Sequence, residues 1–277
     1  MEILRVILGS TGLIGSAWQR YQPTSAIVDR TIIENWFSDQ ATDSLGNFFE
    51  DLPKDREIEL HFCFGNTNST ENLDRLMQIN CHWPLSIARQ ALMRNFRIVT
   101  YGSALEIFRI KNNYFETKRA FAAELGKLET RNRWTNVHLH TLYSDSRPRP
   151  HMFLGQIYSA LQNSSSFSMT SGKQLREFHH VDDDIRIIES ALRSNFNPNL
   201  EISHGRPTEL VQVAKYLFDS FNLGHLLRVN SYPDYPNDNY TKIFLANPIQ
   251  DGVSHREPLS TLQSIFARLL EEDKVIE

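Results

Sequence analysis

The chain has few of the features that mark secreted, membrane or nucleic-acid-binding proteins. Its 277 residues include only 2 cysteines, Cys63 and Cys81, too few for a disulfide framework, which indicates a reducing compartment. No apolar run approaches the roughly 20 residues of a membrane span, and the N-terminus shows neither a basic leader nor a cleavage site. A net charge of −4 provides no global basic field for nucleic acid. We expect a cytoplasmic protein with no membrane and no nucleic-acid partner.

The composition that remains is that of an ordinary folded protein. Hydrophobic residues make up 40% and charged residues 22% of the chain. A chain of this length can form one large domain, or a main domain with a small appendage. It contains no internal repeat and no long low-complexity tract.

Short apolar runs alternate with helical patterns over the first 144 residues. Strands are predicted at 3–9, 25–29, 31–36, 58–65, 96–103 and 135–144, and helices at 12–21, 42–52, 71–95 and 113–129. Pro84 should kink or restart the third helix, because proline lacks the N–H donor and clashes with the preceding turn. Strands alternating with helices of this length predict a parallel sheet covered on both faces.

The pattern loosens after Pro148 and Pro150. Helices are predicted near 151–162 and at 209–221 and 260–272, and the stretch 166–192 suggests a strand pair that leads into a helix. We therefore predict a first domain over 1–150 and a smaller lobe over 151–277 that closes over a ligand, with some of its segments returning to the sheet.

The loop GSTGLIG follows the first predicted strand and opens the first predicted helix. This context favours a dinucleotide-binding fingerprint, in which Gly9 allows the tight turn, Gly12 lets the backbone approach a pyrophosphate, and Gly15 lets helix and strand pack closely. The spacing is GxxGxxG instead of the usual GxGxxG, and a plain tight turn is the alternative. The predicted cofactor-binding residues of this loop are Gly9, Thr11, Gly12, Leu13, Ile14 and Gly15.

Asp29 ends the second predicted strand, 20 residues after Gly9, where a carboxylate that binds the adenosine ribose is expected. Such a carboxylate would repel a 2′-phosphate, whereas the neighbouring Arg30 could attract one. A solvated surface position is the alternative for Arg30. The sequence therefore leaves NAD and NADP both open as cofactor.

The stretch YFETK places Tyr114 and Lys118 one helical turn apart on the same face. A lysine ammonium there is expected to lower the tyrosine pKa from its ordinary value of roughly 10, which would make the phenol a usable acid–base group. Ser103 ends the predicted strand just before this helix. The three residues are the predicted catalytic set.

Several motifs now stand in one order along the chain: the loop 9–15, NCHWP at 80–84, Ser103, Tyr114 with Lys118, LYSD at 142–145 and LREFHHVDD at 175–183. In this order they resemble the short-chain dehydrogenase/reductases, and more closely the extended branch, the NAD-dependent epimerase/dehydratase type that modifies nucleotide-activated sugars. The resemblance covers nearly the whole chain. It implies an α/β fold with a Rossmann-like doubly wound parallel sheet, NAD(P) bound by the first domain, and a smaller C-terminal substrate-binding lobe.

The resemblance also implies roles for individual residues. Ser103 and Tyr114 would hydrogen-bond the reacting oxygen, and Tyr114 would exchange the proton while a nicotinamide exchanges hydride. Lys118 would hold the nicotinamide ribose, so Tyr114 and Lys118 also belong to the cofactor-binding set. Asn80 would support that lysine, and with Gly65 it completes this set.

Substrate binding is implied for Ser103, Thr141 and Arg176. Arg176 would bind the diphosphate of the sugar nucleotide as a bidentate guanidinium. Thr141 stands where the family often has an asparagine that contacts the substrate. The alternative for Arg176 is a surface ion pair with Glu177 or with an aspartate at 182–184.

The implied function is an NAD(P)-dependent oxidoreductase that acts on a nucleotide-activated sugar. Ser103 and Tyr114 are only 11 residues apart, so the loop that usually leans over the sugar is trimmed, and this favours a 4-keto-sugar reductase. A nucleotide-sugar epimerase with retained NAD and a non-catalytic NAD(P)-binding protein are the alternatives. The stretch SALE at 103–106 lacks the Asp-Glu pair of the dehydratases, so we do not expect water elimination.

The stretch HHVDDD, residues 179–184, is the only candidate for a metal site noted in the sequence. Neighbouring residues of one strand point to opposite faces, so His179 and His180 cannot easily share an ion. A strand that runs into an aspartate-capped helix is the simpler interpretation, and we predict no metal site.

A homodimer is expected from the resemblance. The helices 71–95 and 113–129 would pair across a two-fold axis. The apolar residues available for this contact are Leu76, Ile79, Phe121 and Leu125, which could equally belong to the core.

Overall fold

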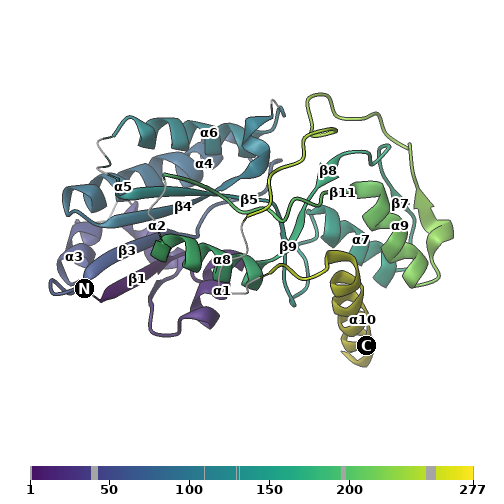
Figure 1. The fold of residues 1–277 in the computed structure, drawn as a ribbon, viewed down its shortest axis with the longest axis horizontal. Coiled ribbons are helices and arrows are strands. Elements are labelled where there is room, and N and C mark those ends of the chain that lie inside the picture. The colour runs from purple at the N-terminus through teal and green to yellow at the C-terminus, as the bar shows by residue number, and fades with distance from the viewer. Residues whose placement is uncertain are drawn as a thin grey trace. The chain divides into compact units, whose positions relative to one another are not determined.

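The computed structural model describes residues 2–38, 43–108, 110–128, 130, 132–194, 198–247 and 254–276 (Figure 1). The chain forms two compact units. Unit 1 comprises Met1–Ile107, Lys111–Leu139 and Ile185–Ile202, and unit 2 comprises Phe108–Ile110, His140–Asp184 and Ser203–Glu277. Unit 1 thus includes a segment from late in the sequence, and the domain boundary predicted at residue 150 stays a prediction.

Unit 1 is built on a six-stranded sheet with the order β10-β5-β4-β3-β1-β2, in which all neighbouring strands are parallel. Its strands are β1 (Ile3–Leu8), β2 (Ala26–Val28), β3 (Glu57–Phe62), β4 (Arg97–Ser103), β5 (Trp134–Leu139) and β10 (Asn199–Glu201). The chain runs from β1 outward to β2 and then crosses to β3, so the strand order reverses between β1 and β3. In such sheets ligands bind at the carboxyl ends of the strands beside this switch point.

Helices cover both faces of this sheet. They are α1 (Leu13–Tyr21), α2 (Arg30–Trp36), α3 (Ser44–Glu50), α4 (Leu73–Met77), α5 (Trp83–Met93), α6 (Asn113–Gly126) and the part of α8 (Val181–Ser194) from Ile185 on. Figure 1 shows α4, α5 and α6 along one side of the strands and α1 with α8 along the other. On the apolar face, Val6, Leu60 and Ile98 pack in one buried cluster with Phe49 of α3 and Leu125 of α6. The predicted doubly wound parallel sheet is confirmed.

The opposite face carries a buried polar network. Arg5 Nε lies 2.8 Å from Glu59 Oε1, and Arg5 Nη2 lies 2.5 Å from Glu189 Oε2 of α8. His61 Nε2 is 3.0 Å from Glu59 Oε1, and its Nδ1 is 2.7 Å from the hydroxyl of Tyr101. Burial alone would raise the pKa of Glu59, but the hydrogen bonds and charge of its partners lower the pKa to about 2. The carboxylate is therefore a buried charge held by its neighbours.

Two predicted elements of unit 1 differ in the structure. Residues 31–36, predicted as a strand, belong to the helix α2. Asp29 Oδ1 accepts a hydrogen bond from Ile32 N at 2.9 Å and so caps the start of this helix. The buried residues Ile33 and Trp36 are three positions apart, which places them on one face of the helix. The predicted helix 71–95 is divided into α4 and α5 by a π-helical turn, Gln78–His82, ahead of Pro84. Residue 42 of the predicted helix 42–52 and residue 129 of 113–129 lie outside the described residues.

The apolar residues proposed for a dimer contact belong to the core of the chain. Leu76 and Leu125 have exposed fractions of 0%, and Ile79 and Phe121 are 4% and 6% exposed. Side chains that are buried within one chain cannot contact a second copy without unfolding it. The assignment of these four residues to a dimer interface is therefore wrong.

Unit 2 has its own core. Ile157 of α7 (Phe153–Gln162), Val213 of α9 (Leu210–Ser220) and Phe266 of α10 (Pro258–Ile276) pack with Phe178 in one buried cluster. Three two-stranded ladders join distant segments: β6 (Thr141–Tyr143) with β9 (Phe178–His180), β7 (Phe167–Ser168) with β12 (Leu227–Arg228), and β8 (Leu175–Arg176) with β11 (Thr208–Glu209). The strand pair predicted within 166–192 is wrong, because each of its short strands pairs outside this stretch.

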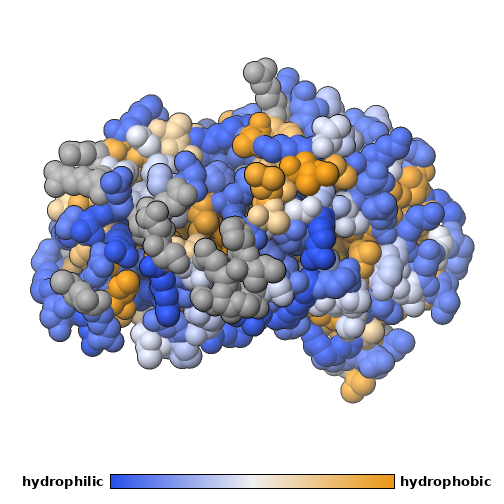
Figure 2. Space-filling model, viewed as in Figure 1, coloured by the Kyte–Doolittle hydropathy of each residue, from blue (hydrophilic) through white to orange (hydrophobic). Residues whose placement is uncertain are grey.

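The outer surface carries no continuous apolar belt on the side that Figure 2 draws; hydrophobic areas there are separate from one another in a mostly hydrophilic surface. Within the described ranges, none of the helices has the length and apolar character needed to cross a bilayer.

Candidate functional site

The glycine loop closes on itself after β1. Gly9 has a φ of +89°, and a Cβ there would lie 2.6 Å from Phe64 N, in the segment after β3. A Cβ at Gly15 would lie 2.2 Å from Gly9 O. Gly12 differs, because a Cβ there would approach nothing closer than Cys63 O at 3.3 Å. Gly9 and Gly15 are therefore needed by the loop itself, whereas a Cβ at Gly12 would meet a tight contact with the Cys63 carbonyl but no severe overlap.

The start of α1 suits an anionic group. Gly12 is the N-cap residue and provides no side-chain cap, and Thr11, Leu13 and Ile14 are all at least partly exposed. The first N–H groups of a helix have no intrahelical acceptors, and the helix dipole adds positive potential at this end. The loop lies at the switch point between β1 and β3, so its residues fit the diphosphate of a dinucleotide.

Asp29 and Arg30 follow β2 and begin α2. The Asp29 carboxylate caps the helix through one oxygen, Oδ1. The guanidinium of Arg30 lies 2.8 Å from Glu34 in an ion pair, and its side chain is 57% exposed. This arrangement matches the alternative interpretation of Arg30 as a surface residue. The capping hydrogen bond of Asp29 uses only Oδ1, so the second carboxylate oxygen, Oδ2, does not take part in it.

The predicted catalytic residues gather at the carboxyl end of β4. Ser103 is the last residue of the strand, and Lys118 Nζ donates to the backbone carbonyl of Tyr101 at 2.9 Å. Tyr114 lies in the first turn of α6, where its N–H donates to Asn112 Oδ1 (2.8 Å), and its ring centroid is 5.9 Å from Lys118 Nζ. Lys118 thus contacts the strand that Ser103 ends, and Tyr114 lies one helical turn before Lys118.

A carboxylate that the sequence analysis did not assign lies among them. Glu106 is buried, and its Oε1 accepts from the backbone N–H of Ser103 at 2.7 Å. Burial raises the pKa of Tyr114 well above its ordinary value, and the Glu106 charge adds to this. Burial lowers the pKa of Lys118, and Glu106 and Cys63 oppose that change. The expectation that Lys118 lowers the tyrosine pKa is therefore wrong for this structure.

Asn80 connects the loop after β3 to α6. It lies in the π-helical turn, accepts from Asn66 N at 2.8 Å, and donates to Asn66 O at 2.9 Å and to Thr117 Oγ1 at 3.1 Å. A Cβ on Gly65 would lie 3.1 Å from Asn80 Oδ1, so glycine permits this close contact. Because Thr117 precedes Lys118, Asn80 fixes the helix turn that carries the lysine.

The other two predicted substrate-binding residues belong to unit 2. Thr141 begins β6, and its N–H donates to the Glu177 carbonyl at 3.0 Å. Arg176 Nη2 lies 2.8 Å from Asp238 Oδ1, so its acidic partner is none of those suggested by the sequence. A common site of these residues with Ser103 stays a prediction.

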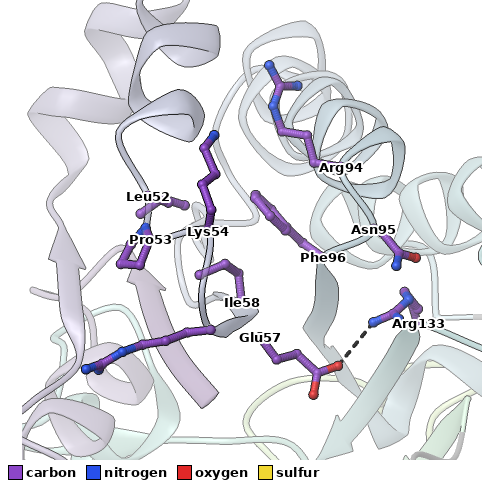
Figure 3. Close-up of a pocket in the computed structure, with 10 residues that line it drawn as sticks. Leu52, Pro53, Lys54, Glu57, Ile58, Arg94, Asn95, Phe96 and Arg133 are labelled. Atoms are coloured by element: carbon purple, nitrogen blue, oxygen red, sulfur yellow. Dashed lines mark hydrogen bonds and ion pairs between the residues drawn. The ribbon is translucent and has the colours of Figure 1, made fainter. Parts of the chain in front are cut away.

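A surface pocket lies elsewhere in unit 1, at the amino ends of β3 and β4. Figure 3 shows its lining, which includes Lys54, Glu57, Arg94 and Arg133. The cations have acidic partners: Arg133 is 3.1 Å from Glu57, and Lys54 and Arg94 are 2.9 and 3.2 Å from Glu50. Since ligands of doubly wound sheets bind at the carboxyl ends of the strands, this pocket is not the candidate site.

No family model matches the chain, and no curated protein matches its sequence. Solved structures match its fold. The UDP-glucose 4-epimerase of Thermotoga maritima with UDP-glucose is 13% identical, with a TM-score of 0.76 and 100% of both chains covered. MoeE5 in complex with UDP-glucose and NAD is 16% identical, with a TM-score of 0.73 over 96% of this chain and 99% of that one. DesIV, the dTDP-glucose 4,6-dehydratase of Streptomyces venezuelae with NAD bound, is 12% identical, with a TM-score of 0.74 over 99% and 98%.

The chain therefore has the fold of known nucleotide-sugar epimerases and dehydratases. The resemblance to the extended short-chain dehydrogenase/reductases, inferred from ordered motifs, is confirmed at the level of the fold. At identities of 11% to 16% the likeness concerns the fold alone.

Proposed function

We propose that the chain is an NAD(P)-dependent oxidoreductase that acts on a nucleotide-activated sugar. The observation that carries this proposal is the grouping at the end of β4, where Lys118 donates to the Tyr101 carbonyl of the strand that Ser103 ends and lies one helical turn from Tyr114. The glycine loop at the switch point supports the cofactor assignment. Known proteins of the same fold with UDP-glucose and NAD bound support the ligand classes.

In this proposal the chain's own residues bind and protonate the substrate. A bound nicotinamide supplies the hydride. The Ser103 hydroxyl and the Tyr114 phenol hydrogen-bond the reacting oxygen, and Tyr114 transfers a proton at that atom. Burial and the Glu106 charge raise the pKa of this phenol. The short stretch between Ser103 and Tyr114 inclines us to a 4-keto-sugar reductase, with Lys118 assigned to the nicotinamide ribose.

The cofactor assignment favours NAD. Asp29 places a carboxylate directly after β2, where it would repel a 2′-phosphate, and Arg30 is already paired with Glu34. Solved structures of this fold that contain NAD agree with this choice. A cytoplasmic location is part of the proposal, and the free thiols Cys63 and Cys81 are compatible with it. A homodimer would need a surface other than the buried helix residues predicted from the sequence.

A nucleotide-sugar 4-epimerase is the second candidate, because 4-epimerases share this fold over nearly the whole chain. The two candidates differ in what happens to the cofactor. A reductase consumes NADH with a 4-keto-sugar nucleotide, whereas an epimerase retains NAD and interconverts two sugar nucleotides without net change.

The deciding experiment measures cofactor and turnover together. Purified protein is denatured and the released nucleotide is quantified by its ultraviolet spectrum. Native protein is then assayed for NADH oxidation with UDP- and dTDP-4-keto sugars, and for interconversion of UDP-glucose and UDP-galactose. NADH oxidation supports the reductase, and interconversion with retained NAD supports the epimerase. Failure to bind any nicotinamide nucleotide would refute both.

A further inference from the structure

Unit 2 brings four of the 10 histidines of the chain together beside two buried carboxylates. The side chains of His179 and His204 are buried, and His140 and His255 are half-buried. The ring centroids of His179 and His204 are 4.7 Å apart, and those of His179 and His255 are 4.3 Å apart. The side chains of Glu177, His179 and His204 are 1%, 0% and 4% exposed. The whole group, here called the histidine cluster, is His140, Glu177, His179, Asp184, His204 and His255.

We propose that Glu177, His179 and His204 bind a divalent transition-metal ion, with zinc as the best fit. Glu177 Oε2 lies 3.1 Å from His179 Nε2 and 3.4 Å from His204 Nδ1, and the donor atoms of all three residues lie within 4.8 Å of one another. Zinc bound tetrahedrally at about 2.0–2.1 Å has neighbouring ligand atoms about 3.3 Å apart. The spacing around the Glu177 oxygen therefore suits tetrahedral zinc.

The residues around this set orient it. His179 Nδ1 lies 2.9 Å from Asp184 Oδ1, which gives the carboxylate–histidine–metal arrangement that fixes a ligating imidazole. Glu177 Oε1 accepts from the Ser203 hydroxyl at 2.9 Å, which turns the other oxygen, Oε2, toward the histidines. The Arg206 N–H lies 3.1 Å from His204 Nδ1, so this nitrogen carries a lone pair; an ion would replace that hydrogen bond.

One unpartnered buried nitrogen supports a ligand in this cluster. Within the part of the chain that the structure describes, His140 Nε2 has no hydrogen-bond partner; Asp184 Oδ2 and His204 Nε2 have none either, but the proposed ion would not contact them. Leaving a buried polar atom unpaired costs roughly 1–3 kcal/mol, so a bond from His140 Nε2 to the ion would remove that cost at one atom. His140, whose ring centroid lies 5.2 Å from that of His179, is the candidate for a fourth ligand.

Two other groups of potential ligands fit less well. His179 Nδ1 and His255 Nε2 lie 2.9 and 3.0 Å from one Asp184 oxygen. These distances are farther from the spacing of about 3.3 Å in a tetrahedral zinc site than the 3.1 and 3.4 Å around Glu177 Oε2, where an ion would replace the hydrogen bond between Glu177 and His179. The group around His180 is looser, at 3.5 Å to Asp145 and 3.9 Å to Asp182, and the Asp145 side chain is 65% exposed. His179 and His180 thus lie in different groups, as the alternation along a strand requires.

A closed and buried site of this kind would be structural, because it joins β9 to the segment at residues 203–204 and leaves no exposed ligand position. The proposal does not depend on the enzymatic activity proposed above. It departs from the sequence prediction of no metal site. That prediction considered only adjacent residues, whereas His204 follows His179 by 25 positions.

The test uses the full chain purified without a metal-affinity tag. The protein is stripped with a chelator and titrated with Zn²⁺ and Co²⁺. We expect saturation at about one ion per chain, a visible Co²⁺ spectrum typical of four-coordinate nitrogen and oxygen ligands, and a higher melting temperature with Zn²⁺. If the folded wild-type chain shows no saturable binding of either ion, the proposal is wrong whatever the variants do.

Variants then identify the ligands. His204→Gln and Glu177→Gln should abolish the Co²⁺ spectrum, and Asp184→Asn should weaken affinity by roughly 10- to 100-fold as a supporting residue. The matched control is His225→Gln, an exposed histidine of unit 2, which should bind as wild type does. Loss of binding in His255→Gln with retention in His204→Gln would overturn the assigned ligand set.

Discussion

The buried polar network of the sheet allows a quantitative prediction for Glu59→Gln. Glu59 is 1% exposed and contacts both Arg5 and His61, so the substitution removes a charge but keeps the shape of the side chain. Arg5 then retains Glu189 as its only ionic partner among the described residues. Breaking a buried ion pair typically costs about 3–5 kcal/mol. We expect unit 1 to lose stability on that order at pH 7.

The lowered pKa of Glu59 predicts how this contribution to stability depends on pH. The pKa of Glu59 is lowered from 4.5 to about 2, which corresponds to about 3 kcal/mol of stability. A lowered carboxyl pKa stabilises the fold above pH 4.5, and this contribution is lost as the pH falls from 4.5 toward 2. Glu59→Gln should therefore be less stable at pH 7 and lose less stability than the wild type on acidification.

Tryptophan fluorescence reports unit 1 selectively, because all 4 tryptophans of the chain lie in it: Trp18, Trp36, Trp83 and Trp134. Urea unfolding of wild type and Glu59→Gln is followed by this signal between pH 7 and pH 3. The control is Glu34→Gln, which removes an exposed pair with Arg30 and should change stability by less than about 0.5 kcal/mol. Equal midpoints and equal acid dependence for wild type and Glu59→Gln would refute the reasoning.

Three further predictions concern the candidate site. Tyr114→Phe should reduce turnover by about 10²- to 10⁴-fold while the cofactor still binds, measured by steady-state kinetics and nucleotide titration; wild-type turnover would contradict its role. Lys118→Met should reduce both turnover and cofactor affinity, because the lysine contacts the Tyr101 carbonyl and is assigned to the ribose; unchanged affinity would remove the second role. Gly12→Val should abolish nucleotide binding, because the side chain would fill the space that a pyrophosphate needs beside the backbone, and the protein should still fold, because the nearest atom to a Cβ there is Cys63 O at 3.3 Å. Gly15→Ala should disturb the loop itself, because a Cβ there would overlap Gly9 O. Calorimetry measures nucleotide binding and circular dichroism measures folding, so the two effects can be separated.

Much of unit 1 could be predicted from the sequence because its elements are long or end in glycine. The strand predicted at 3–9, the glycine loop and the helix that carries Tyr114 are each indicated by neighbouring residues in the sequence, and the structure contains all three. Residues 31–36 were predicted as a strand because the run TII is β-branched. The structure has a helix there, which the Asp29 carboxylate stabilises by capping its first turn. Short strands such as β7 and β8 have no local partner, so sequence cannot pair them.

The candidate site could be predicted in part, for reasons that are equally physical. Ser103, Tyr114 and Lys118 follow one another along the chain, so their order is visible. Glu106 is also close in sequence, but its effect on Tyr114 depends on burial, which the sequence does not give. The histidine cluster was missed because His140 and His255 are 115 positions apart and only the fold brings them together.

The buried ion pair between Arg5 of β1 and Glu59 of β3 also bears on how these two strands align. A slip of one residue would turn Arg5 into the apolar cluster, but a slip of two keeps every side chain on its face, so hydrophobic patterning alone does not oppose it. Such a slip would place Arg5 opposite His61, or opposite Glu57, which already pairs with Arg97 and Arg133. It would also move Gly9 by about 7 Å along the strand, away from Phe64. The ion pair near the amino end of β1 thus helps to set the position of the glycine loop at the carboxyl end of the strand.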